Sequence, residues 1–197
     1  MWNRSSDNSR MHEPNPQVGS TWRRWDLHVH SPASLVNSYG GEAGWGQFLA
    51  ELAGLPDGYV LGINDYLFVD GYQRVLDAHQ SGKLPNIAAV FPVVEFRLSN
   101  LVGTHGHLSR INAHVIFSNE VTPDTTQGQF INGLSSSYEL DPELDLDTGW
   151  TGLPTRDGLE EFGGAIKKSL PPDRREQYHE TDLILGFNNL VVPLDAV

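Results

Sequence analysis

Short apolar segments with the composition of buried strands alternate along this chain with segments of helical spacing. Residues 59–65 and 87–96 are almost wholly apolar and rich in β-branched side chains, which is typical of strands covered on both faces. The expected strands are residues 25–30, 59–65, 87–96, 111–117 and 183–192. The expected helices are residues 44–55, 70–80 and 159–170. This alternation predicts an α/β fold in which helices cover a parallel sheet.

Composition excludes several classes of protein. The chain has 197 residues, of which 39% are hydrophobic, enough for one domain with a sizeable core. Its 25 acidic residues outnumber 13 basic ones, and the net charge of −12 argues against a basic nucleic-acid-binding face. The absence of Cys excludes disulfides and cysteine-bound zinc. No apolar run reaches the roughly 18 residues of a membrane span, and no secretory signal is present, so we expect a cytoplasmic protein.

Two stretches differ from the rest of the chain in composition. Residues 1–20 are polar and rich in Asn, Ser and Pro, and we expect them to form a disordered leader before a domain at 21–197. Residues 119–155 contain many acidic side chains and no Lys or Arg, which indicates an acidic loop or insertion. They lack the Gly and terminal Glu of an EF-hand, so a calcium loop is rejected.

Histidines lie two residues apart on the first predicted strand. Strand side chains alternate between faces, so we expect His28, His30 and Asp26 to share one face. Two imidazoles on one face suit a divalent metal such as zinc, iron or manganese. Asp26 could orient a histidine or bind the metal directly. The plainer explanation of the pair is two exposed surface histidines.

Three further strand segments each contain an ionisable residue. Because a buried unpaired carboxylate is costly, Glu95 either pairs with Arg97 or Arg110 or binds a cation. His114 is either a ligand or a core histidine that bonds to the backbone. Asp65 ends a strand, and the carboxyl ends of parallel strands meet at one edge of a sheet. Carboxylates mixed with imidazoles favour two adjacent divalent ions over a closed structural site.

These segments resemble the motifs of the PHP (polymerase and histidinol phosphatase) family in order and spacing. The four motifs of the family correspond to residues 26–31, 63–66, 94–95 and 114–116. Residues 19–34, with the sequence GSTWRRWDLHVHSPAS, are more particularly similar to the N-terminal PHP domain of TrlF-like proteins. Residues 70–72 and 94–97 share this similarity. In those proteins the domain precedes an SMC-like ATPase region.

The resemblance implies a distorted seven-stranded β/α barrel, which this chain would contain in C-terminally truncated form. It also implies a centre of two or three divalent ions (zinc, manganese or iron). Together with the strand argument, it gives as candidate metal ligands His28, His30, Glu95, His114, Asp26 and Asp65. Tyr66 stands where much of the family has a metal-binding histidine. The family's final ligands, a distal His and an Asp-x-His motif, have no evident counterpart.

The leading hypothesis is therefore a metal-dependent phosphoesterase domain, the N-terminal part of a larger ATPase-linked protein. Asp65 would bind a metal or position the attacking water, and Arg97 or Arg110 would hold substrate oxygens. The substrate would be a phosphorylated small molecule or a nucleic-acid end, and the partner an SMC/AAA-like ATPase region in cis or in trans. One alternative is a weakly active or inactive sensing or docking domain for that ATPase. A weaker alternative is an amidohydrolase-type metal hydrolase.

Overall fold

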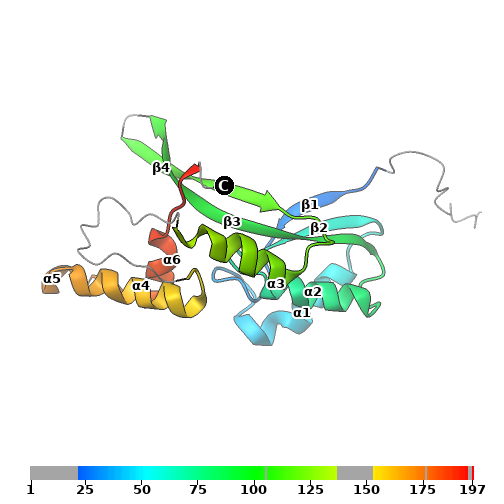
Figure 1. The fold of residues 1–197 in the computed structure, drawn as a ribbon. Helices are drawn as coiled ribbons and strands as arrows, with labels where there is room; N and C mark the ends of the chain where they lie inside the picture. The colour runs from blue at the N-terminus through cyan, green and yellow to red at the C-terminus, as the bar shows by residue number, and fades with distance from the viewer. Residues whose placement is uncertain (1–21, 105, 137–152, 176, 195–196) are drawn as a thin grey trace, which may run out of the picture.

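The computed structural model describes residues 22–104, 106–136, 153–175, 177–194 and 197. The leader expected at residues 1–20 and residues 137–152 of the acidic stretch lie outside these ranges. The strands are β1 (Trp25–Val29), β2 (Tyr59–Asn64), β3 (Ile87–Thr104) and β4 (His107–Ile116). The longer helices, shown in Figure 1, are α1 (Trp45–Ala53), α2 (Asp70–Gln80), α4 (Arg156–Ser169) and α6 (Asp182–Asn189). The short helical segments are η1 (Gly41–Gly44), α3 (Pro123–Thr125), η2 (Thr126–Ile131), η3 (Asn132–Ser136) and α5 (Pro172–Arg175).

The strands form one sheet in the order β1-β2-β3-β4, and the direction of β4 corrects the predicted fold. β1, β2 and β3 are parallel, whereas β4 is antiparallel to β3. The expected parallel α/β sheet and seven-stranded β/α barrel are therefore wrong for the residues that the structure describes. β3 and β4 meet in a tight turn at Gly106, whose φ is 91°. A parallel fourth strand would need a long crossover connection, and this turn leaves no place for one.

The segment predicted as a strand over residues 183–192 is mainly the helix α6. The hydroxyl of Thr181 accepts a hydrogen bond of 3.3 Å from the backbone N–H of Ile184, which caps the first turn of that helix. Leu185 and Phe187 are buried in the core. A short apolar run fits a buried helix and a buried strand equally well, so hydrophobicity alone did not distinguish the two.

Two glycines let α4 and α6 pack closely. A β-carbon added at Gly163 would collide with the carbonyl oxygen of Asp182, and one added at Gly186 would collide with that of Leu159. The backbones of the two helices therefore touch at these positions, where any larger residue would push them apart. Within the parts of the chain described here, no helix is both long and apolar enough to cross a membrane.

The core consists of two clusters on the helical side of the sheet (Figure 1). In the first, Phe48 of α1 and Tyr72 of α2 pack with Leu61 of β2. In the second, α4, α6 and η2 pack with the later part of β3 and with β4. Ile131 of η2 is fully buried there. The described part of residues 119–155 thus includes helical turns anchored in the core, in addition to acidic surface.

The pairing of the sheet has two irregularities. The register between β1 and β2 shifts between Asp26 and Val29, where three steps along β1 match two along β2. β2 pairs with only the first part of β3, up to Val93. Beyond that point, the segment after α6 pairs with β3. Val192 forms an isolated parallel bridge with Leu98, and its N–H donates to the carbonyl oxygen of Arg97 at 2.9 Å.

Candidate metal centre

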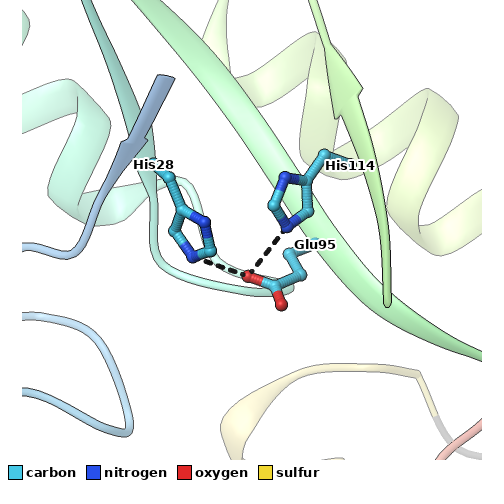
Figure 2. Close-up of side chains that lie close together, drawn as sticks. All are labelled: His28, Glu95 and His114. Carbon is cyan, nitrogen blue, oxygen red and sulfur yellow. Dashed lines mark ion pairs between the residues drawn. The ribbon is translucent and has the colours of Figure 1, made fainter. Parts of the chain in front are cut away.

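Three of the predicted ligands meet at one place, although they come from three strands. Figure 2 shows His28 of β1, Glu95 of β3 and His114 of β4. Nε2 of His28 lies 3.5 Å from Oε2 of Glu95, and Nε2 of His114 lies 3.3 Å from the same oxygen. Glu95 and His114 are direct partners across the antiparallel pair, so their side chains share a face. One ligand atom from each residue lies within 4.8 Å of the other two, and we call these residues the three-residue group.

The spacing and chemistry of this group fit a small divalent ion. Ligand atoms placed tetrahedrally around zinc, at bond lengths of about 2.0–2.1 Å, lie about 3.3–3.4 Å from one another. The two nitrogen-to-oxygen distances of 3.3 Å and 3.5 Å are close to that value. The Glu95 side chain is only 3% exposed, so its carboxylate needs a compensating partner. The His28 side chain is 52% exposed, which leaves one side of the group open to solvent.

His30 lies beside the three-residue group without belonging to it. Its Nε2 is 3.2 Å from Nε2 of His28, and its Nδ1 is 3.4 Å from the hydroxyl of Ser34. The pKa of His30 is lowered, mainly because burial disfavours the charged imidazolium and also because His28 repels it. Its ring is therefore neutral near pH 7, the form in which imidazole binds metals. His30 is a candidate fourth ligand.

Two asparagines that the sequence analysis missed hold the carboxylate of Glu95. Nδ2 of Asn64 donates to Oε2 at 2.7 Å, and Nδ2 of Asn112 donates to Oε1 at 2.6 Å. Hydrogen bonds to an ionised acceptor are among the stronger ones in proteins. A neutral amide gives no metal-binding signal in a sequence. Their positions could have indicated this role. Asn112 precedes His114 by two residues on the same strand, and Asn64 ends β2.

Asp26 is not part of the three-residue group. Its side chain is exposed, and its Oδ1 accepts a hydrogen bond of 3.2 Å from the backbone N–H of His28. The prediction that Asp26, His28 and His30 share a face assumed strict strand alternation. The register of β1 shifts between Asp26 and Val29, so strict alternation is not assured through this stretch.

Asp65 also lies outside the three-residue group, and both its carboxylate oxygens contact Ser31. The backbone N–H of Ser31 donates to Oδ1 at 2.7 Å, and the hydroxyl of Ser31 donates to Oδ2 at 2.6 Å. Gly71 of α2 lies against the same carboxylate, where a β-carbon would collide with Oδ2. Burial raises the pKa of Asp65 to about 6. The contacts show Asp65 fixing the loop that follows His30.

Tyr66 packs against the candidate ligands through its ring. The ring stacks on His30 with centroids 4.9 Å apart, and it meets the edge of Phe187 at 4.7 Å. Its carbonyl oxygen accepts a hydrogen bond of 3.0 Å from the N–H of Glu95. Burial, and then the nearby Glu95 charge, raise the pKa of Tyr66, which favours the protonated phenol in the metal-free chain. Its φ of 62° is the only positive value at a non-glycine among the residues described.

The two arginines expected to hold substrate oxygens have contacts elsewhere. Nη1 of Arg97 donates to the carbonyl oxygens of Phe187 and Asn188 at 3.4 Å and 3.2 Å. Its guanidinium also lies over the Phe187 ring, 4.9 Å from the centroid. Nη1 of Arg110 donates to the carbonyl oxygen of Ser99 at 3.4 Å. Arg97 thus binds the C-terminal end of α6, a place where a positive charge is favourable.

Comparison of this chain with known protein families, curated proteins and solved structures finds no match. The geometry of the site and the motifs of the sequence are therefore the grounds on which a function is proposed. His28, Glu95 and His114 together offer two imidazoles and one carboxylate, a donor set that zinc, iron and manganese all accept.

Proposed function

We propose that this chain is a divalent-metal-dependent hydrolase that acts on phosphoester bonds. The convergence of His28 and His114 on the buried carboxylate of Glu95 supports a metal centre. The resemblance of the surrounding motifs to PHP phosphoesterases supports the reaction class. The proposal does not depend on the barrel of that family, because the sheet described here has a different architecture.

In this proposal the side chains of the three-residue group hold the ion and leave one side of it accessible. A bound divalent ion polarises a phosphoryl oxygen and lowers the pKa of a coordinated water toward neutrality. Glu95 supplies a negative charge that offsets part of the charge of the ion, and the half-exposed His28 lies on the side open to substrate. The substrate would be a phosphorylated small molecule or a nucleic-acid end, since a net charge of −12 disfavours contact with a long duplex.

The surroundings of the group favour one second candidate function, a metal-binding sensing or docking domain with little activity. The pKa of Tyr66 is raised in the metal-free chain, and Asp65 has both oxygens bonded to Ser31. Among the described residues, neither side chain is placed to act as a general base at the three-residue group. In this alternative the partner is an SMC/AAA-like ATPase region, in cis or in trans, as the TrlF-like resemblance implies.

The test measures bound metal and turnover on the same samples. The chain is loaded with manganese or zinc and assayed with p-nitrophenyl phosphate, bis-p-nitrophenyl phosphate and a p-nitroanilide. We expect metal-dependent release from a phosphoester, abolished by a chelator. We expect His114→Gln to weaken metal binding on the order of a hundredfold or more, since even residues behind the ligands cost 10–100-fold. His107→Gln, at an exposed histidine on the same strand, is the matched control and should leave both readouts unchanged.

The outcomes separate the candidate functions. Bound metal without turnover of either phosphoester supports the sensing or docking domain. Cleavage of the anilide alone supports an amidohydrolase and contradicts the proposed reaction class. Equal metal content in wild type, His114→Gln and His107→Gln would show that metal does not bind at the three-residue group.

A further inference from the structure

We infer that this centre holds a single metal ion, and that Asn64 and Asn112 are positioning residues that make Glu95 a ligand through Oε2 alone. The inference rests on the proposed metal centre and adds the number of ions and the coordination of the carboxylate. In the common two-oxygen bridging mode, a carboxylate presents one oxygen to each of two ions. The surroundings of the two Glu95 oxygens differ in a way that opposes such bridging.

Both histidines of the three-residue group approach the same oxygen. Nε2 of His28 and Nε2 of His114 lie 3.5 Å and 3.3 Å from Oε2 of Glu95. Asn64 donates to this oxygen from another direction, at 2.7 Å. A carboxylate oxygen has about two acceptor positions, so the bond from Asn64 leaves one position on Oε2 for a metal. That remaining position lies on the side where the two imidazoles converge.

The other oxygen, Oε1, is bound by a residue that lines a largely apolar cleft. Asn112 donates to Oε1 at 2.6 Å. Glu95 and Asn112 line a cleft whose other walls are mainly apolar, with Tyr66, Phe96 and Phe187 among them. The walls of this cleft include no imidazole and no second carboxylate among the described residues. A second ion at Oε1 would therefore find no strong ligand besides Glu95 itself.

Among the described residues that line this cleft, Arg97 is the charged residue besides Glu95. Its bonds to the carbonyl oxygens of Phe187 and Asn188 fix it there, and its positive charge would repel a second cation. Asp65, the remaining predicted carboxylate, has both oxygens bonded to Ser31. A second ion thus lacks ligands on the Oε1 side, whereas His30 lies next to His28, where it could complete the coordination of the first ion.

The experiment counts ions and then removes one of the two amides. Native mass spectrometry of the whole chain, titrated with zinc and separately with manganese, gives the number of ions per chain at saturation. Cobalt titration gives the affinity and the visible absorption spectrum of the bound ion. Asn112→Ala is the informative variant, because Asn112 is exposed and its loss does not open the core. Asn119→Ala, at an exposed asparagine just after β4, is the matched control.

We expect one ion per wild-type chain at saturation. We expect Asn112→Ala to bind cobalt about 10–100-fold more weakly, with an altered absorption spectrum, and Asn119→Ala to match wild type. A purely structural role for Asn112 would lower the free energy of unfolding and leave the spectrum unchanged. Two or more specific ions per wild-type chain, or an unchanged affinity and spectrum in Asn112→Ala, would overturn the inference. These readouts do not depend on turnover, so one bound ion without phosphoester cleavage would contradict the proposed reaction and leave this inference standing.

Discussion

Ser31 and Asp65 form a two-point contact in the protein interior. The backbone N–H and the hydroxyl of Ser31 donate to the two carboxylate oxygens of Asp65, at 2.7 Å and 2.6 Å. Both residues are fully buried. Burial outweighs the two hydrogen bonds and raises the pKa of Asp65 from 3.8 to about 6. The folded chain therefore binds a proton at this carboxyl at a higher pH than the unfolded chain does.

We expect the metal-free chain to become more stable relative to Asp65→Asn as the pH falls from about 7 to about 4. In that window the folded state binds the proton and the unfolded state does not, so each step down in pH favours folding. A pKa raised from 3.8 to about 6 corresponds to about 3 kcal/mol. Urea unfolding of both proteins with a chelator present measures the difference. Parallel stability profiles over this range would contradict the expectation.

Much of the secondary structure could be predicted from the sequence, and the topology could not. Periodicity located β1, β2, α1, α2 and α4 to within a few residues. It could not show that β3 and β4 continue into a hairpin, because residues 100–104 and 107–109 are exposed and no buried apolar face marks them as strand. Periodicity also predicted a strand where α6 lies. That segment is a helix that Thr181 caps and that packs closely on α4 at two glycines, and neither feature shows in the hydrophobic pattern.

The ionisable members of the candidate site could be predicted, but their surroundings could not. His28, Glu95 and His114 stand out as polar residues within strand-like segments. Asp26 lies outside the three-residue group, and no residue pattern revealed the register shift between Asp26 and Val29. The contact of Asn112 with Glu95 could be inferred only from the strand register, which pairs Asn112 with Arg97 and His114 with Glu95. Pairing across strands is a property of the folded sheet and is not contained in any single strand.

Tyr66→Phe should bind metal with the same affinity as wild type, within about threefold. The ring, rather than the phenol oxygen, stacks on His30, and the raised pKa of Tyr66 keeps the phenol protonated near neutral pH. Iron(III)-loaded wild type should accordingly lack a phenolate-to-iron absorption band between about pH 6 and 8. A band that disappears in Tyr66→Phe would identify Tyr66 as a ligand. Tyr66→Ala should weaken metal binding, because it removes the ring that supports His30.

Gly163→Ala should lower the free energy of unfolding by about 1–3 kcal/mol, the usual cost of overpacking. The new β-carbon would meet the carbonyl oxygen of Asp182 and push α4 from α6. Gly164→Ala is the matched control, since its β-carbon would meet only the side-chain carboxylate of Asp182, at 3.3 Å. There the helix propensity of Ala should leave stability unchanged or raise it by up to about 1 kcal/mol. Equal losses in both variants, measured by denaturant unfolding, would contradict this packing.

Arg97→Met should destabilise the chain by about 1–3 kcal/mol and leave the KM for a phosphoester unchanged. The guanidinium binds carbonyl oxygens at the end of α6, and hydrogen bonds from a charged donor are worth about that much. Arg175→Met is the control: Arg175 also binds helix carbonyl oxygens, but it is exposed, so we expect a smaller loss. A large rise in KM at unchanged stability would instead restore Arg97 as a substrate-binding residue.

His28 and His114 come from strands at opposite edges of the sheet, yet their ring centroids are only 4.7 Å apart. In a flat sheet the edges would be separated by three strand spacings, about 14 Å. The sheet is therefore curled, and an ion held by both histidines would be a cross-link between its two margins. Binding that ion would slow amide hydrogen exchange in β1 and β4 together, while the backbone of α1, which carries none of the candidate ligands, would exchange as before.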